Sequence, residues 1–384
     1  MKFERLGNII TIAKGKKPVF SESPNKNSIR VLQIDDLRND SNIKYTDDKS
    51  GVLAKEDDIL IAWDGANAGT IGYGKTGFIG STIAVLRKNK PKDFDTVFIG
   101  KFLQTQFSFL RNKSTGATIP HINRHSLDNL KIPLIALSDQ IQIVNILCKA
   151  ETLIEQRKRS IALLDEFLKS TFLEMFGDPM KREQRWKNES CGNLFDMKLG
   201  KMLSAKNYTG THLKKYLRNV NVKWGEIDLS DVKEMDFSER EVENYNLLKG
   251  DILVCEGGDV GRTAILKYDL KNYCYQNAIH RLRIKDNKRI DANYFFWFMY
   301  LGVTKGLIKN ATFSVTIQHF TQERFKKFYI PIPPIELQTK FANIVIKTES
   351  LKEQYKNSLQ ELENLYGSLS QRAFKGELKA EMNT

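Results

Sequence analysis

The sequence predicts an α+β protein with an internal pseudo-two-fold repeat: two similar mixed domains with short strands, separated by two long antiparallel coiled-coil helices. Three observations lead to this prediction. Segments of the second half of the chain match segments of the first half in the same order. Short β-type runs alternate with glycine, asparagine and aspartate turns. Two long stretches place apolar residues at alternating spacings of three and four, which is typical of a coiled-coil seam.

The internal repeat rests on a series of matched segments. The pairs are Leu6–Ile10 with Cys191–Phe195, Asp58–Leu60 with Asp251–Leu253, Ile83–Arg87 with Ile279–Arg283, Thr118–Ile122 with Thr316–Phe320, and Lys131–Leu134 with Tyr329–Ile332. Gln140 then falls on Gln338. Chance can supply any one of these matches, but it does not supply all of them in one order. We therefore interpret the sequence as an internal duplication.

Each copy begins with a mixed domain, at residues 1–137 and at residues 178–335. Both domains contain short apolar runs of β type, such as ILIAW in the first and DILVCE in the second. Both also contain an aromatic helical stretch, at residues 97–110 and 294–308. This mixture of short strands and a helix predicts an α+β domain in each copy.

Each copy ends in a long helix, predicted at residues 138–177 and within residues 336–384. Ser138 is the expected N-cap of the first helix, and Asp139 lies in the first turn, where the helix dipole favours an acid. The first seam consists of Leu147, Ile154, Ile161, Leu168 and Met175, and the second of Leu351, Tyr355, Leu359, Leu362, Leu365 and Leu369. A helix of about 38 residues is about 57 Å long. It exceeds one turn of B-DNA, about 34–36 Å, which favours a spacer over a helical hairpin that closes a core.

Charge and composition limit the possible partners and compartments. Lysine and arginine outnumber acidic residues 60 to 46, which gives a net charge of +14 and a pI near 9.4. A dispersed basic excess is typical of a surface that faces a polyanion such as nucleic acid. The sequence has no membrane-spanning apolar run and no signal-peptide pattern. Its four cysteines are far apart, which indicates a reducing, cytoplasmic location and no disulfide framework.

One segment satisfies a catalytic pattern to the letter. Residues 69–76, GTIGYGKT, fit the phosphate-loop pattern GxxxxGK[ST]. A true phosphate loop follows a buried strand and opens a helix. Here a polar loop precedes the segment and a β-like run follows it, so we expect a strand–turn–strand setting without a nucleotide. No metal-ligand cluster, nucleophile elbow or methyltransferase signature appears elsewhere in the sequence, so we expect no catalytic, cofactor or metal site in this chain.

The motifs that end each domain and each helix resemble the specificity subunit of type I restriction-modification systems. The segments that carry the resemblance are KIPL at 131–134 with Gln140, IPIPP at 330–334 with Gln338, FLEMFGDP at 172–179 and LSQRAFKGEL at 369–378. The resemblance covers essentially the whole chain. It departs from the family pattern before the helix glutamine, where the usual glutamate is replaced by Asp139 in the first copy and Leu337 in the second.

The resemblance implies partners that carry the chemistry. Each of the two target-recognition domains would read one half of a split sequence in double-stranded DNA. The paired helices would set the gap and dock two methyltransferase subunits, which bind S-adenosylmethionine. Two motor-nuclease subunits that use ATP and magnesium would complete the enzyme. This chain itself would be non-catalytic.

The best candidates for DNA contact are polar side chains at equivalent loop positions of the two copies, because side chains on base edges read sequence while lysine and arginine on phosphates hold register. In the first domain they are Lys14, Lys16, Lys17, Trp63, Asn67, Thr118, His121, Arg124 and His125. In the second domain they are Lys198, Lys201, Arg218, Asn219, Arg262, Thr316, Gln318 and His319. Matching positions carry different side chains, such as Pro120 against Gln318, which predicts two unlike half-sites. Each candidate could instead be an ordinary solvated loop residue.

Two other functions remain open at this stage. One is a stand-alone DNA-binding coiled-coil protein without a methyltransferase partner. The other is an NTP-dependent enzyme that uses Lys75 of the GxxxxGKT segment. Co-purification with a methyltransferase would argue against the first, and a nucleotide titration of the isolated chain would test the second.

Overall fold

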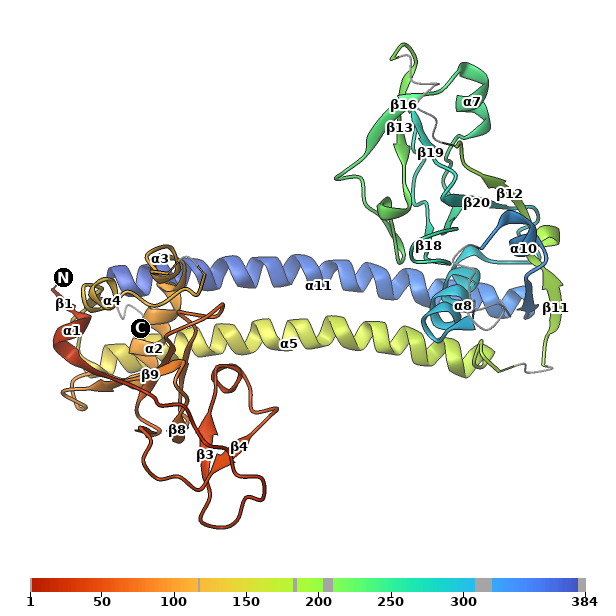
Figure 1. Cartoon of the computed structure of the whole chain (residues 1–384). Coiled ribbons are helices and arrows are strands. Elements are labelled where there is room, and N and C mark those ends of the chain that lie inside the picture. Colours follow the sequence, from red (N-terminus) through yellow and green to blue (C-terminus); the bar gives the residue numbers. More distant parts are fainter. Residues whose placement is uncertain (1, 117, 182–184, 203–209, 308–319, 379–384) are drawn as a thin grey trace, which may run out of the picture. The chain divides into compact units, whose positions relative to one another are not determined.

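A computed structural model of the chain describes residues 2–116, 118–181, 185–202, 210–307 and 320–378. The chain forms two compact units. Unit 1 contains residues 1–158 and 357–384, and unit 2 contains residues 159–356. Each unit therefore combines one mixed domain with part of both long helices, and Figure 1 labels the elements of each.

The described strands of unit 1 form three sheets. In the smallest, β1 (Phe3–Arg5) pairs antiparallel with β10 (Lys131–Pro133), so that the two ends of the domain are joined. The other sheets have the strand orders β2-β9-β6-β7 and β4-β3-β8-β5. Their strands are β2 (Ile10–Lys14), β3 (Ile29–Leu32), β4 (Lys44–Thr46), β5 (Leu53–Ala54), β6 (Ile59–Ala62), β7 (Ile71–Tyr73), β8 (Gly77–Ile79) and β9 (Ile83–Lys88). The short helices are α1 (Leu6–Ile9), η1 (Asp35–Leu37), α2 (Thr96–Thr105), α3 (Phe107–Asn112) and α4 (Arg124–Asp128).

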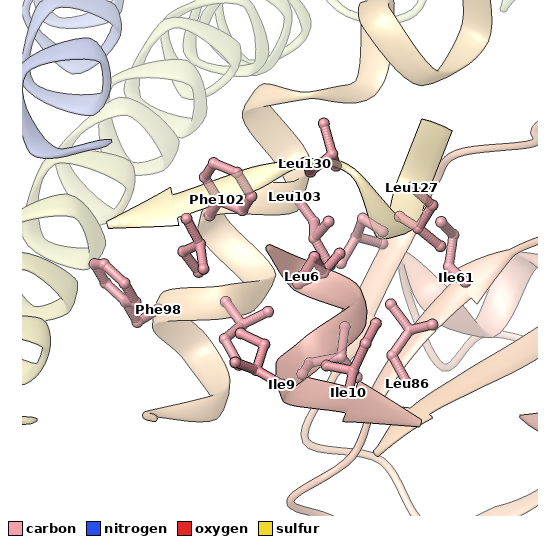
Figure 2. Packing of buried hydrophobic residues seen from close by; sticks show 14 of the residues in the cluster. Leu6, Ile9, Ile10, Ile61, Leu86, Phe98, Phe102, Leu103, Leu127 and Leu130 are labelled. Atoms are coloured by element: carbon pink, nitrogen blue, oxygen red, sulfur yellow. The ribbon is translucent and has the colours of Figure 1, made fainter. Parts of the chain in front are cut away.

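Strand β6 of unit 1 is buried on both faces. Ile59 and Ile61 belong to a large core that also contains Leu6 and Phe98, and Figure 2 shows Ile61, Leu6 and Phe98 among the packed side chains. Leu60 belongs to a second core with residues of the β4-β3-β8-β5 sheet. Successive side chains of a strand point to opposite faces, so a continuous apolar run is what such a central strand requires.

Unit 2 repeats this arrangement. Strand β11 (Lys187–Ser190) pairs antiparallel with β21 (Tyr329–Ile332), and the central sheet has the order β12-β20-β17-β18. The strands and helices are β12 (Phe195–Leu199), β13 (Leu213–Leu217), β14 (Val222–Lys223), β15 (Glu226–Ile227), β16 (Lys233–Asp236), β17 (Ile252–Cys255), β18 (Thr263–Ile265), β19 (Tyr273–Tyr275), β20 (Ile279–Ile284), α6 (Cys191–Leu194), η3 (Asn219–Asn221), α7 (Glu239–Asn244), α8 (Ala292–Thr304) and α10 (Gln322–Lys326). The predicted α+β class and the internal repeat are therefore confirmed.

The two long helices are α5 (Leu137–Phe176, 40 residues) and α11 (Ile335–Lys375, 41 residues). Helix α5 begins at Leu137, so Ser138 does not cap it; the carbonyl of Ala136 accepts the first helical hydrogen bonds instead. Seam residues Leu147 and Leu168 are fully buried, as the heptad pattern predicts. The prediction is wrong for Leu351 and Leu365 of the second seam, because both side chains are exposed and do not lie in the contact between the helices.

Within each unit the two helices run antiparallel. In unit 1 the Tyr366 hydroxyl donates to Glu151 at 2.6 Å, and Lys158 pairs with Glu363 at 2.9 Å. In unit 2 the Phe341 ring contacts those of Phe172 and Phe176, with centroids 5.4 Å apart in each case. In unit 1, Lys158 comes after Glu151 on α5, whereas its partner Glu363 comes before Tyr366 on α11. The two helices therefore run in opposite directions, which is the antiparallel pairing that the sequence predicts.

A buried glutamine ties the start of each long helix to the preceding domain. The Gln140 Oε1 accepts from the backbone N–H of Asp95 at 2.9 Å, and its Nε2 donates to the carbonyls of Asp93 and Ile135 at 2.9 and 3.0 Å. In unit 2 the Gln338 amide makes the same three kinds of bond. Its partners are the Asp291 N–H at 2.9 Å and the carbonyls of Arg289 and Pro333 at 3.2 and 2.7 Å.

Two other repeated contacts hold the central sheet. A buried aspartate at the start of β6, Asp58, pairs with Arg87 of β9 at 2.7 Å. Asp251 and Arg283 form the equivalent pair in unit 2, also at 2.7 Å. Gly15 is required at its position, because a Cβ there would lie 2.3 Å from the carbonyl oxygen of Gly80. Gly200 is the matching residue of unit 2, with a backbone oxygen at the same distance.

The GxxxxGKT segment lies in the setting that its flanking residues predict. It runs from the turn before β7 to the turn before β8, and no helix follows it. Lys75 is held by Asp40, with the Nζ and Oδ1 atoms 2.8 Å apart. A phosphate loop needs the N-terminal amides of a helix, so this geometry does not fit one.

Candidate DNA interface

Three segments of unit 1 that are distant in sequence meet beside the central sheet. They are the end of β2, the loop after β6 and the connection between α3 and α4. The backbone N–H of Gly65 donates to the carbonyl of Pro120 at 2.9 Å, and the N–H of Ile122 donates to the carbonyl of Trp63 at 2.9 Å. Arg111 adds a side-chain bond to the Gly65 carbonyl at 3.3 Å. The two loops are therefore fixed to each other.

Asp64 lies at the centre of this junction and binds two of the predicted residues. Its Oδ2 is 2.7 Å from the Nζ of Lys14, and its Oδ1 is 2.5 Å from the Nδ1 of His121. Partial burial raises the pKa of Asp64, but the hydrogen bonds and charges of Lys14 and His121 outweigh it and leave the pKa below its usual value. The carboxylate is only 15% exposed, whereas the side chains of Lys14 and His121 are 49% and 47% exposed.

The other predicted residues of unit 1 are distributed around this junction. Trp63 packs against the core, and the Asn67 side chain accepts from Arg38 at 2.9 Å. Arg124 and His125 lie on α4, where Arg124 pairs with Asp128 at 3.5 Å and the His125 ring contacts Asn129. The remaining candidates are exposed: Lys16, Lys17 and Thr118.

In unit 2 the structure brings Arg218, Asn219 and Arg262 together. Arg262 donates to the carbonyl of Asn219 at 2.7 Å and pairs with Asp259. The Asn219 amide donates to the Gly257 carbonyl at 3.4 Å, in the loop that corresponds to the Asp64 loop of unit 1. Arg218 pairs with Asp231 at 2.7 Å.

Lys198 and Lys201 lie apart from that cluster, beside α7. Lys198 donates to Asn244 at 2.8 Å, and Lys201 pairs with Glu241 at 2.8 Å while its side chain is 13% exposed. The last three candidates, Thr316, Gln318 and His319, lie outside the described residues. DNA contact by any of the named residues stays a prediction.

Sequence reasoning missed Asp64, Arg38 and Arg111. It favoured side chains that donate hydrogen bonds, and Asp64 can only accept as a carboxylate. Arg38 and Arg111 were not chosen as candidates, because the sequence comparison matched neither of them with a basic residue of the second copy. The signal available in the sequence was the position of Asp64 directly after a buried strand, where loop side chains are commonly placed for binding.

A second histidine, His280, is fully buried in unit 2 and links β20 to Phe320. Its Nε2 is 2.8 Å from the Phe320 carbonyl, so Nε2 carries the proton, and its Nδ1 has no hydrogen-bond partner among the described residues. Burial lowers the pKa of His280 to about 4, although the bond to Phe320 opposes the shift.

The lowered pKa predicts an acid-sensitive unit 2. Between pH 6.5 and 4 the unfolded chain binds a proton at His280, whereas the folded chain does not. The contribution of neutral His280 to the free energy of unfolding is therefore fully present above pH 6.5. It falls by up to about 3 kcal/mol as the pH is lowered to 4. Urea unfolding at several pH values should show this slope in the native chain. His280→Gln, whose amide keeps a donor without titrating, should flatten it, and His125→Gln on exposed α4 should not. Equal slopes in all three proteins would contradict the assignment.

Among the residues that the structure describes, no group of three or more His, Cys, Asp or Glu side chains could hold a metal ion. In the same part of the chain, no helix is long and apolar enough to cross a membrane.

Comparison with known proteins identifies the family. The family model described as the type I restriction modification DNA specificity domain matches residues 1–164 and 183–364. The MjaVIII specificity subunit of Methanocaldococcus jannaschii is 26% identical over 381 residues, covering 94% of this chain and 88% of that protein. The EcoKI specificity subunit of Escherichia coli K12 is 25% identical over 309 residues, covering 74% and 66%.

Solved structures support the same fold. The S subunit from M. genitalium aligns with a TM-score of 0.58 at 17% identity, covering 97% of this chain and 96% of that one. A chain from a structural study of complex assembly in the type I R-M system aligns with a TM-score of 0.64 at 16% identity, covering 98% of each.

Two copies of one mixed domain, each leading into a long helix, define a duplicated two-domain protein. This chain belongs to the family of type I restriction modification DNA specificity domains, since the family model matches most of both copies. Its role is DNA sequence specificity in a type I restriction-modification system.

Proposed function

We propose that each mixed domain reads one half of a bipartite, asymmetric DNA site. The observation that carries this proposal is that the framework is repeated while the loops are not. The bonds of Gln140 recur at Gln338, and Asp58–Arg87 recurs as Asp251–Arg283. Among the described residues the loop clusters differ, because unit 1 has Asp64 with Lys14 and His121, whereas unit 2 has Arg262 with Asn219. Equal frameworks with unlike loops suit two readers of unlike half-sites.

The long helices are proposed to set the spacing and to dock the methyltransferase subunits. Each helix is about 60 Å long at 1.5 Å per residue, longer than the roughly 34–36 Å of one DNA turn. Each unit also exposes apolar side chains at equivalent helix positions. Leu153 and Leu351 follow Gln140 and Gln338 at the same interval, and Phe167 and Leu365 form a second such pair. Repeated apolar exposure supports two equivalent docking sites for two copies of one partner.

The chemistry is proposed to reside in the partners. Two methyltransferase subunits would bind S-adenosylmethionine, and two motor-nuclease subunits would use ATP and magnesium, while this chain acts without catalysis in the cytoplasm. The GxxxxGKT segment supports no competing enzyme, because Lys75 is paired with Asp40 and no helix follows the turn.

Exchange of one recognition domain tests the proposal. Residues 1–137 would be replaced by the corresponding domain of a relative with a different target, and the methylated sequence would be determined by methylome sequencing of cells with and without the gene. We expect one half of the methylated sequence to change and the other half and the methyltransferase partner to stay the same. A change in both halves, or in neither, would contradict the two-reader proposal. Failure to co-purify with a methyltransferase subunit would favour a stand-alone DNA-binding protein.

A further inference from the structure

The contact of Asp64 with Lys14 and His121 joins polar side chains from three segments of unit 1 that are distant in sequence. Lys14 is the last residue of β2, Asp64 follows β6, and His121 lies in the connection before α4. Loops in this region are already joined through backbone bonds between Gly65 and Pro120 and between Trp63 and Ile122. The side-chain cluster is therefore added to a junction that the backbone already holds.

Unit 2 has no lysine at the position that matches Lys14, and His319, the counterpart of His121, lies outside the described residues. Strand pairing places Lys14 opposite Ala84 in unit 1 and Leu199 opposite His280 in unit 2, so Leu199 replaces Lys14. Contacts that the fold requires recur in both units, as the glutamine and aspartate–arginine contacts do. Leu199 cannot form the ion pair that Lys14 makes with Asp64, so this pair is one of the features in which the two units differ, as the DNA half-sites that they read are proposed to differ.

The chemistry of the cluster fixes how its side chains are presented. Asp64 is ionised, because its pKa is held below its usual value by Lys14 and His121 against the opposing effect of burial. A carboxylate only accepts hydrogen bonds, so Nδ1 of His121 carries a proton and Nε2 is left for another partner. The ammonium of Lys14 has three donor hydrogens and uses one of them on Asp64. Both side chains are about half exposed, so they can reach a ligand while the carboxylate restricts their rotation.

We infer that Asp64 is a positioning residue that presents Lys14 and His121 to the DNA half-site read by unit 1, an inference that rests on the proposed function. Lysine donates to the O6 and N7 atoms of guanine or to phosphates, and a histidine Nε2 contacts a base edge or a phosphate. A side chain that is oriented before binding loses less conformational entropy on contact, so it discriminates better between base pairs.

The test uses the complete methyltransferase complex with Asp64→Asn. The probes are a duplex that carries the methylated sequence, duplexes with one or the other half scrambled, and a duplex with both halves scrambled. We expect the discrimination between the correct and the scrambled first half to fall by about tenfold or more. Binding to the fully scrambled duplex should not weaken, because the change removes a negative charge. Discrimination at the second half should stay the same.

Asp40→Asn is the matched control. Asp40 also holds two cations of unit 1, Arg30 and Lys75, and it is not among the candidate DNA residues. We expect this variant to keep the native discrimination at both halves. Two further variants, Lys14→Met and His121→Ala, each remove one presented side chain and leave Asp64 in place, and each should lower discrimination at the first half only. If the Asp64→Asn variant does not assemble into the complex, the Lys14→Met and His121→Ala variants still test the inference.

Three results would overturn the inference: native first-half discrimination in the Asp64 and Lys14 variants, an equal loss at both halves, or a parallel loss of specific and scrambled binding. The last two would indicate a structural role for Asp64. The proposed function fails separately, if the native complex shows no half-site discrimination that depends on residues 1–137.

Discussion

Replacing Phe374 with alanine is expected to destabilise unit 1 by about 3–5 kcal/mol, the usual cost of emptying a buried aromatic position. Phe374 lies near the end of α11 and is 8% exposed. Its ring packs on Phe98 and Phe102 of α2, with centroid distances of 5.3 and 5.6 Å. The last turns of α11 thus close a core built by the first domain of the chain. Losing this side chain removes contacts from both rings at once.

Hydrogen exchange can locate the effect of Phe374→Ala. Amides of β6 and β9 in unit 1 should exchange faster, while those of β17 in unit 2 should keep their protection. Phe176→Ala provides the reciprocal measurement, because Phe176 of α5 occupies the equivalent place in unit 2 and packs on Tyr294 with centroids 4.8 Å apart. It should weaken unit 2 alone. Leu365→Ala, at a half-exposed position of α11, should change stability by less than about 0.5 kcal/mol.

The opposite pattern would refute this account of the core. If Phe374→Ala increased exchange in unit 2 and not in unit 1, or changed stability no more than Leu365→Ala does, the end of α11 would not close the first domain. A functional measurement should agree with the exchange data. Under the proposed function, methylation of the half-site assigned to the first domain should become less selective as unit 1 loosens, while the other half keeps its selectivity.

The role of Phe374 shows which part of the fold the sequence could predict. The heptad seam and the repeated motifs depend on local spacing, so they predicted the long helices and the duplication. Local spacing does not say which domain the end of a helix covers. The core of unit 1 joins Leu6 to Phe374, near opposite ends of the sequence. Only the antiparallel pairing of α5 and α11, expressed in contacts such as Glu151–Tyr366, brings them together.

The candidate interface was predictable to a similar extent. Lys14 and His121 were expected from their residue types and their places in loops, and the structure brings them together on Asp64. Lys201 has the same residue type, yet it is largely buried against Glu241 of α7. Sequence alone cannot separate these cases, because the difference depends on which carboxylate the fold places beside each cation.

Replacing Gln140 or Gln338 with leucine is expected to destabilise the corresponding unit by at least about 3 kcal/mol. Each amide is fully buried and serves one backbone N–H and two backbone carbonyls. Leucine has a similar volume but leaves these three groups without their partner, and each orphaned group costs about 1–3 kcal/mol. Gln140→Leu should lower the stability of unit 1, and Gln338→Leu that of unit 2.

Denaturant unfolding combined with hydrogen exchange would measure these two effects separately. Gln142→Leu is a matched control, since Gln142 lies one half-turn along α5 at an exposed position and should tolerate the change. Gln140→Glu separates hydrogen bonding from shape: it keeps the size of the side chain but turns an oxygen toward the carbonyls of Asp93 and Ile135, so it should destabilise unit 1 as well. If the glutamate variant were as stable as the native chain, packing and not the hydrogen bonds would join each domain to its helix.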